Sequence, residues 1–108
     1  MQRVDDNTKF EVETTKEHIQ LVFHRSNGKG YSADQRVNFP RTHMRQVITA
    51  LNAPKSEKVQ LDTTTSLEMT LSANRKALTL LLRQKNQEEE VASFPVNAIP
   101  PIVQALTA

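Results

Sequence analysis

The sequence predicts an α+β fold in which two ββββα repeats form one pseudo-two-fold domain of antiparallel sheets and two helices. Two observations support this. Two Phe-Pro pairs, at Phe39 and Phe94, each precede a segment with helical apolar spacing. Alternating apolar runs come before each pair, and polar turn residues separate those runs. We expect a single domain over 1–108, with repeat 1 about 1–53 and repeat 2 about 54–108.

The repeat is clearest from each Phe-Pro pair onward. Residues 39–53 align without gaps to residues 94–108, and five of the fifteen pairs are identical, where about one is expected by chance. Apolar residues then fall at i, i+3, i+4 and i+7 in both copies: Met44, Val47, Ile48 and Leu51, then Ile99, Ile102, Val103 and Leu106. This spacing predicts helices over about 42–52 and 97–107, with Thr42 and Asn97 as their N-caps.

The strands are predicted from alternation. In the repeat, residues 3–13 align with residues 60–70. Ile19, Leu21 and Phe23 fall at every second position, as Leu78, Leu80 and Leu82 do. The expected strands are 2–5, 9–15, 18–25 and 34–39, then 58–63, 66–72, 76–83 and 89–94. The four phenylalanines fall on core-facing positions. The solvent-facing positions are Glu11, Glu13, His18, Gln20, Val22, His24, Arg36, Asn38 and Glu68. The linker at 52–57 is too short to separate two domains, so the repeats should share one core.

Composition excludes several classes of protein. The chain has no Cys, which rules out disulfides, thiolate metal sites and a Cys nucleophile. No apolar run is long enough to cross a bilayer, and no apolar run follows the charged N-terminal residues, so we expect a soluble, cytoplasmic protein. The net charge of +2 does not by itself indicate a nucleic-acid partner.

The positive charge is concentrated in the first repeat. Residues 16–45 hold six basic and two acidic residues, whereas residues 54–108 hold six of each. We expect a nucleic-acid-binding surface formed by Lys16, Arg25, Lys29, Tyr31, Arg36, Arg41 and Arg45. The Asn-Gly segment at 26–31 is interpreted in two ways. It is either a structural hairpin loop, or a basic loop that contacts a nucleic-acid backbone while Tyr31 stacks on a base.

No catalytic or metal-binding constellation is predicted, and no cofactor is expected. His18 and His24 are six residues apart on one strand face, about 20 Å by strand geometry, so they cannot share a metal ion. The third histidine, His43, lies near a helix start. The run at 62–66 is interpreted as a polar strand end, and Glu88–Glu90 as a solvated edge equivalent to residues 33–35. We therefore expect a protein that is not an enzyme.

The order of four strands and a helix, present twice with a strand-Pro-helix junction, resembles PUR-repeat proteins, Whirly proteins and the positive cofactor 4 type of transcriptional coactivator. The resemblance implies binding of single-stranded DNA or RNA on the sheets and a role in transcription regulation. A second resemblance, to sliding-clamp domains, would place Arg41 and Arg45 on DNA. The alternative function is a non-enzymatic interaction or assembly module that docks a partner through a sheet edge or a helix face. Open sheet edges also make a homodimer plausible.

Overall fold

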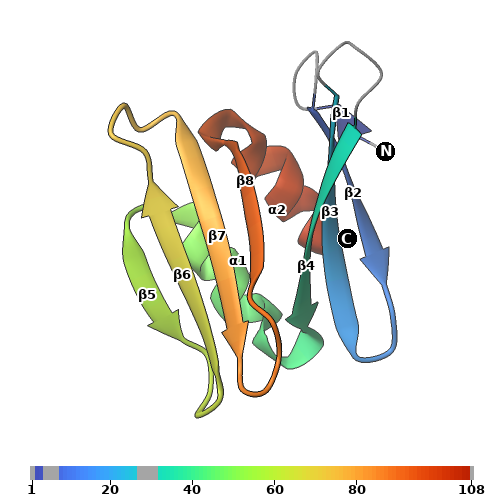
Figure 1. Cartoon of the computed structure of the whole chain (residues 1–108), viewed down its shortest axis with the longest axis vertical. Coiled ribbons are helices and arrows are strands. Elements are labelled where there is room, and N and C mark those ends of the chain that lie inside the picture. The colour runs from blue at the N-terminus through green and yellow to red at the C-terminus, as the bar shows by residue number, and fades with distance from the viewer. Residues whose placement is uncertain (1, 4–7, 27–31, 108) are drawn as a thin grey trace.

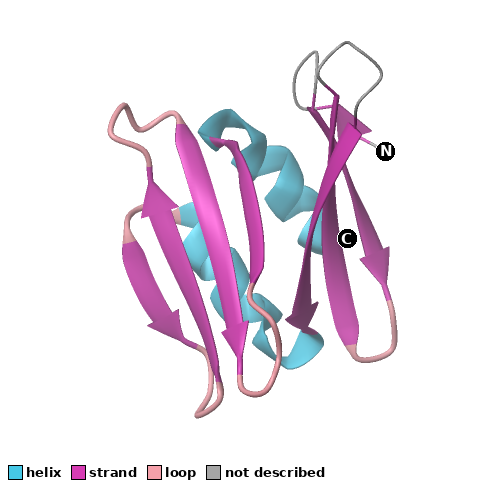
Figure 2. Cartoon of the chain, viewed as in Figure 1, coloured by secondary structure: helices cyan, strands magenta, loops and turns pink. Residues whose placement is uncertain are grey.

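The fold class is the one that the sequence predicts. The computed structural model describes residues 2–3, 8–26 and 32–107. It has an α+β fold with two antiparallel four-stranded sheets, each followed by a helix (Figure 2). Within the described part of the chain, no helix is long and apolar enough to cross a membrane.

The elements follow the repeat. The first sheet has the order β1 (Gln2–Arg3), β2 (Thr8–Thr14), β3 (His18–Ser26) and β4 (Ser32–Pro40). The second has the order β5 (Glu57–Gln60), β6 (Thr65–Leu71), β7 (Ala77–Gln84) and β8 (Glu90–Pro95). Each last strand leads through a 3₁₀ turn, Arg41–His43 or Val96–Ala98, into α1 (Met44–Asn52) or α2 (Ile99–Thr107). The two helices pack against each other on the same side of the sheets (Figure 1).

The two strand-Pro-helix junctions have the same hydrogen bonds. Proline is the last residue of β4 and of β8, where its missing N–H interrupts the ladder. The next residue donates its N–H back across the sheet in both repeats. Arg41 bonds the carbonyl of Glu17 at 3.0 Å, and Val96 bonds the carbonyl of Lys76 at 2.8 Å. The chain then leaves the sheet and begins the 3₁₀ turn.

The prediction that Thr42 and Asn97 cap the helices is wrong. Both residues are exposed and lie within the 3₁₀ turns, and no side-chain hydrogen bond caps either turn or α1. The first N–H groups of α1 and α2, from Met44 and Ile99, instead bond the carbonyl three residues earlier. The turn therefore satisfies donors that a capping side chain would otherwise accept.

One hydrophobic core includes residues of both repeats. Phe23 of β3 stacks on Phe94 of β8, with ring centroids 5.0 Å apart and an interplanar angle of 11°. The Phe10 ring also contacts Phe23, at 6.1 Å between ring centroids and an interplanar angle of 45°. Such aromatic pairs contribute about 0.5–1.5 kcal/mol each beyond their buried area. Since Phe23 and Phe94 come from different sheets, their contact ties the two repeats together.

The edge strands β4 and β8 meet through side chains. The backbone bonds of Arg41 and Val96 make each of these residues one half of a hydrogen-bonded pair with β3 or β7, and such pairs alternate along an antiparallel ladder. The N–H groups of Asn38 and Ser93 therefore point away from β3 and β7. The side-chain oxygen of Gln35 accepts from Ser93 at 3.0 Å, and that of Glu90 accepts from Asn38 at 3.3 Å. Gln35 and Glu90 are equivalent by the repeat, and so are Asn38 and Ser93. The two bonds are therefore a pseudo-two-fold pair.

Two further contacts join β4 and β3 of the first sheet to β8 of the second, and we call this set of contacts the junction between the sheets. The Arg25 guanidinium donates to the Ser93 carbonyl, and the Asn38 side-chain amide donates to Glu90 at 3.3 Å. A buried backbone group left without a partner costs about 1–3 kcal/mol, so these contacts matter for stability. The interpretation of Glu88–Glu90 as a solvated edge is accordingly wrong for Glu90, whose carboxylate bonds the other sheet.

Candidate functional site

Three of the predicted basic residues lie at one end of the molecule. Lys16 is exposed in the turn between β2 and β3, next to Glu17. Arg41 is exposed at the start of the 3₁₀ turn, and its N–H bonds the carbonyl of Glu17. Arg45 is exposed one turn later, on α1. These cations share one end of the first repeat.

The other predicted basic residues lie elsewhere. Arg25 is half-buried and faces the second sheet, where it bonds Ser93. Arg36 lies on the outer face of the first sheet and pairs with Asp34 at 3.5 Å. Lys29 and Tyr31 lie outside the described residues, so the two interpretations of the loop at 26–31 stay predictions. The described members of the predicted surface therefore occupy three separate places.

A charged cluster covers the outer face of the first sheet. Glu11 and Asp34 accept from opposite ring nitrogens of His24, at 3.1 Å to Nε2 and 2.8 Å to Nδ1. The prediction that Val22 faces solvent is wrong, because this residue is fully buried. Its cross-strand neighbours are Glu11 and Arg36, both members of the cluster, so the ion-paired side chains cover it.

The cluster favours the protonated form of His24. Hydrogen bonds to Glu11 and then to Asp34 raise the pKa of His24 above its usual 6.5, against a smaller effect of burial in the other direction. Both nitrogens are occupied, which leaves no lone pair for a metal ion. Among the described residues, no group of three or more His, Asp or Glu side chains is arranged to hold one.

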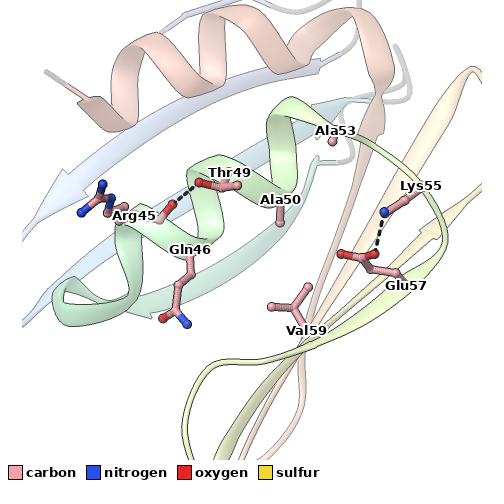
Figure 3. Close-up of a pocket in the computed structure, with 8 residues that line it drawn as sticks. All are labelled: Arg45, Gln46, Thr49, Ala50, Ala53, Lys55, Glu57 and Val59. Carbon is pink, nitrogen blue, oxygen red and sulfur yellow. Dashed lines mark hydrogen bonds and ion pairs between the residues drawn. The ribbon is translucent and has the colours of Figure 1, made fainter.

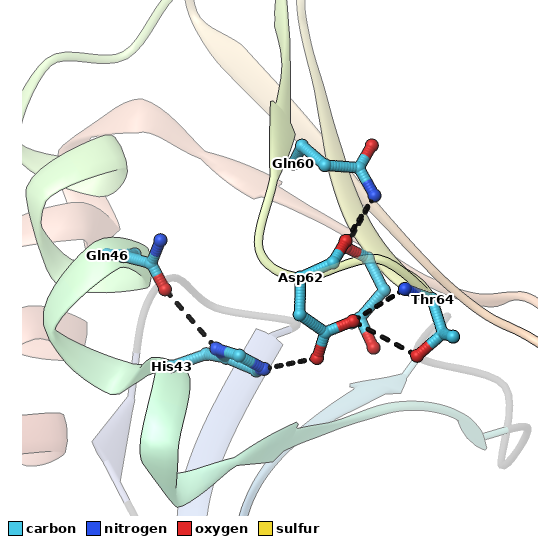
Figure 4. Close-up of polar contacts among 6 residues, drawn as sticks. His43, Gln46, Gln60, Asp62 and Thr64 are labelled. Atoms are coloured by element: carbon cyan, nitrogen blue, oxygen red, sulfur yellow. Dashed lines mark hydrogen bonds and ion pairs between the residues drawn. The ribbon is translucent and has the colours of Figure 1, made fainter.

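A second polar cluster joins α1 to the loop between β5 and β6 (Figure 4). His43 Nε2 lies 2.7 Å from Asp62 Oδ2, and His43 Nδ1 lies 3.2 Å from the Gln46 side-chain oxygen. The other oxygen of Asp62 accepts from the N–H of Thr64 at 2.7 Å and from its hydroxyl at 3.0 Å. These bonds, that from the Thr64 N–H first and then that from His43, lower the pKa of Asp62 well below its usual range.

The His43–Asp62 pair joins the start of α1 to the second repeat and lacks the arrangement of a hydrolase triad. In a hydrolase triad, the second histidine nitrogen would take a proton from a nucleophilic hydroxyl. Here that nitrogen lies against the amide oxygen of Gln46, and the Thr64 hydroxyl is directed to Asp62. The geometry supports the interpretation of residues 62–66 as a polar strand end and fixes the start of α1 to the second repeat.

A groove of about 450 Å³ runs between α1 and edge strand β5 (Figure 3). Ala50, Ala53 and Val59 form its apolar part, and Gln46 and Ala50 point from α1 toward the strand. An ion pair between Lys55 and Glu57, 3.1 Å apart, lies at one end, and Arg45 lies at the other. Thr49 of α1 also lines the groove and is exposed. The groove has the mixed apolar and polar lining that is typical of ligand sites.

Among the described strands, β5 beside this groove pairs with β6 alone, which leaves its outer edge open. Leu61 donates its N–H to the carbonyl of Thr65, which makes these two residues a hydrogen-bonded pair. Pairs alternate along an antiparallel ladder, so Glu57 and Val59 bond β6 while Lys58 and Gln60 point their N–H and C=O groups away from it. An added strand could therefore pair with Lys58 and Gln60.

The sequence gives no signal for this groove. Its volume depends on the separation of α1 from β5, which neither periodicity nor composition reports. The alignment at an offset of 55 pairs Gln35 with Glu90 and Asn38 with Ser93, which shows that these positions are equivalent but not that their side chains bond the opposite sheet. Side chains that bridge two sheets are not distinguishable from solvated ones by alternation alone.

Comparison with known proteins gives no further assignment. Scans against protein-family models, curated protein sequences and solved structures find no match to this chain.

Replacing His24 should change how stability depends on pH. Because the folded state binds the proton more tightly than the unfolded chain, the cluster stabilises the fold below pH 6.5 and this contribution is lost as pH rises through the higher folded pKa. The His24→Gln variant should therefore lose less stability than the wild type between about pH 5.5 and about pH 8.5. Urea unfolding at both pH values measures the difference.

His18→Gln is the matched control on the same strand. It keeps the carboxylate contacts of His24 and should retain the wild-type pH difference. Equal pH differences in His24→Gln and the wild type would contradict the account of the cluster.

Proposed function

We propose that this protein is a non-enzymatic interaction module that binds a segment of a partner protein in the groove between α1 and β5. The observation that carries the proposal is the position of the groove alongside an unpaired strand edge. Extended peptides bind such sites by pairing with the edge while alternate side chains enter the neighbouring groove. The proposal combines the two docking modes expected from the sequence, a sheet edge and a helix face.

The other strand edges support the choice of β5. Side chains of the opposite sheet cover β4 and β8 at Asn38 and Ser93, and coverage of this kind keeps an edge from pairing with another chain. The remaining edge strand, β1, is described over two residues, Gln2–Arg3. Among the described strands, β5 is thus the edge that best accommodates a partner.

Filling the groove should abolish partner binding. Thr49 is exposed on the groove wall, and a Trp side chain at this position would occupy the space next to Ala50 and Ala53. Peptides selected from a random phage-displayed library against the wild type should bind Thr49→Trp at least about tenfold more weakly, a loss of about 1.4 kcal/mol. Fluorescence anisotropy with a labelled selected peptide measures both dissociation constants.

The repeat supplies the matched control. Gln104 is the residue of α2 equivalent to Thr49 and is also exposed. Gln104→Trp should bind the selected peptides as the wild type does. The proposal fails if no peptide is selected, or if Thr49→Trp and Gln104→Trp bind equally well.

Binding of single-stranded nucleic acid is the second candidate function. It is favoured by the position of Lys16, Arg41 and Arg45 at one end of the first repeat, together with the resemblance to PUR-repeat and Whirly proteins. Phosphate contacts by such residues add affinity without selecting a sequence. This function would use the surface of the 3₁₀ turn and the β2–β3 turn.

Removing two of these cations tests the second candidate. A labelled single-stranded oligonucleotide should bind the wild type at about 50 mM salt and dissociate as salt rises, because released counterions drive phosphate binding. The double variant Arg41→Ala, Arg45→Ala should bind more weakly than Lys76→Ala, Lys85→Ala, which removes two exposed lysines of the second repeat. Absence of a salt-sensitive shift in the wild type would exclude this function.

A further inference from the structure

We infer that the partner segment is an extended, acidic peptide of another protein that adds to the second sheet as a fifth strand beside β5. The inference rests on the proposed function and names the class of partner. Three features carry it: the direction of the free backbone groups of β5, the alternation of side chains across that strand, and the charge around it.

The free backbone groups have strand spacing. Lys58 and Gln60 are two residues apart, and both direct their N–H and C=O groups away from β6. An extended chain offers donors and acceptors at the same two-residue interval, so it can bond both positions at once. A helix has already used its own backbone groups and cannot do this. The edge therefore selects an extended segment.

Alternation across β5 sets the side chains of that segment. Val59 faces the groove and packs against the core, whereas Lys58 and Gln60 are exposed on the opposite face. Residues opposite each other on neighbouring strands share a face. Consequently the partner residue beside Val59 enters the groove against Ala50, where an aliphatic side chain fits, and the residue beside Lys58 lies on the outer face.

The charges around β5 favour an acidic partner. Arg45 and Lys58 are exposed, and among the described residues no carboxylate lies within 4.0 Å of either side chain. Glu68, the cross-strand neighbour of Lys58, instead pairs with Arg83 at 3.8 Å. Glu57 is paired with Lys55 at 3.1 Å. A Glu or Asp opposite Lys58 would complete an opposite-charge cross-strand pair.

A second copy of the chain fits less well. Two β5 strands related by a two-fold axis that keeps both α1 helices on the same side must pair residues of the same face. With the axis at Lys58, the two Lys58 side chains lie opposite each other; with the axis at Val59, they are diagonal neighbours. Like charges directly opposite each other are destabilising, and diagonal side chains as long as lysine are still within reach of each other. Sedimentation should accordingly find a monomer at the concentrations used for binding.

The composition of selected peptides tests the partner class. Peptides selected from the random library should be enriched in Glu and Asp and should alternate these residues with Val, Ile or Leu. Selected peptides that Thr49→Trp rejects but that lack acidic enrichment would overturn the inference while leaving the proposed function intact. Competition by a single-stranded oligonucleotide for the same groove would also overturn it, since the groove would then bind a polyanion rather than a peptide.

Two substitutions of Lys58 separate backbone from charge. Lys58→Pro removes an N–H that faces away from the ladder, a position where an edge strand tolerates proline. It should weaken binding of a selected peptide at least about tenfold. Lys58→Thr keeps the N–H and loses the charge, so it should weaken binding less and make it less sensitive to salt.

Amide exchange covers the case in which Lys58→Pro fails to fold. In the wild type, adding a selected peptide should slow exchange of the Lys58 and Gln60 amide protons, which face the added strand. Wild-type affinity in a folded Lys58→Pro protein, or unchanged exchange at both amides in the complex, would contradict strand addition.

Discussion

Two hydrogen bonds between side chains and backbone hold β4 and β8 side by side, and they determine which strand edges of the two sheets are covered. Gln35 accepts from Ser93, and Glu90 accepts from Asn38. Each bond gives a partner to an outward-facing N–H group that would otherwise bond water or remain unsatisfied. The two sheets are thereby joined without forming one continuous ladder, and Phe23 can stack on Phe94 beneath the junction.

The junction determines which strand edges are covered. It covers one edge of each sheet and leaves β5 as the edge beside a groove. The repeats differ at this point. Where α1 has Arg45, Gln46 and Thr49 facing outward, α2 has Pro100, Pro101 and Gln104. The two repeats therefore share one fold but differ in the exposed side chains of their helices. Of the groove-lining residues of α1, Arg45, Gln46 and Thr49 have different residues at the equivalent positions of α2.

Sequence reasoning located the elements well because their signals are local. The Phe39 and Phe94 junctions, the alternation of Ile19, Leu21 and Phe23, and the helical spacing after each Phe-Pro pair all depend on near neighbours in the chain. Alternation failed at Val22, because whether an outward side chain is buried depends on the ion pairs formed above it.

The candidate site was less predictable for a related reason. Charge clustering in the sequence grouped Arg25 with Arg36, yet these residues face opposite sides of the first sheet, and Arg25 bonds the backbone of β8. Sequence proximity of charges does not fix the face on which each one lies. The groove between α1 and β5 arises from tertiary distance, and the free edge of β5 is evident only once the pairing with β6 is known.

Amide hydrogen exchange in the free protein tests the central claim most directly. The claim is that β4 and β8 are closed edges whereas β5 is open. The account predicts slow exchange at Asn38 and Ser93, whose N–H groups bond Glu90 and Gln35, and fast exchange at Lys58 and Gln60, whose N–H groups face away from β6. Exchange at Asn38 and Ser93 as fast as at Lys58 and Gln60 would contradict it, as would protection of Lys58 and Gln60 in the absence of a partner.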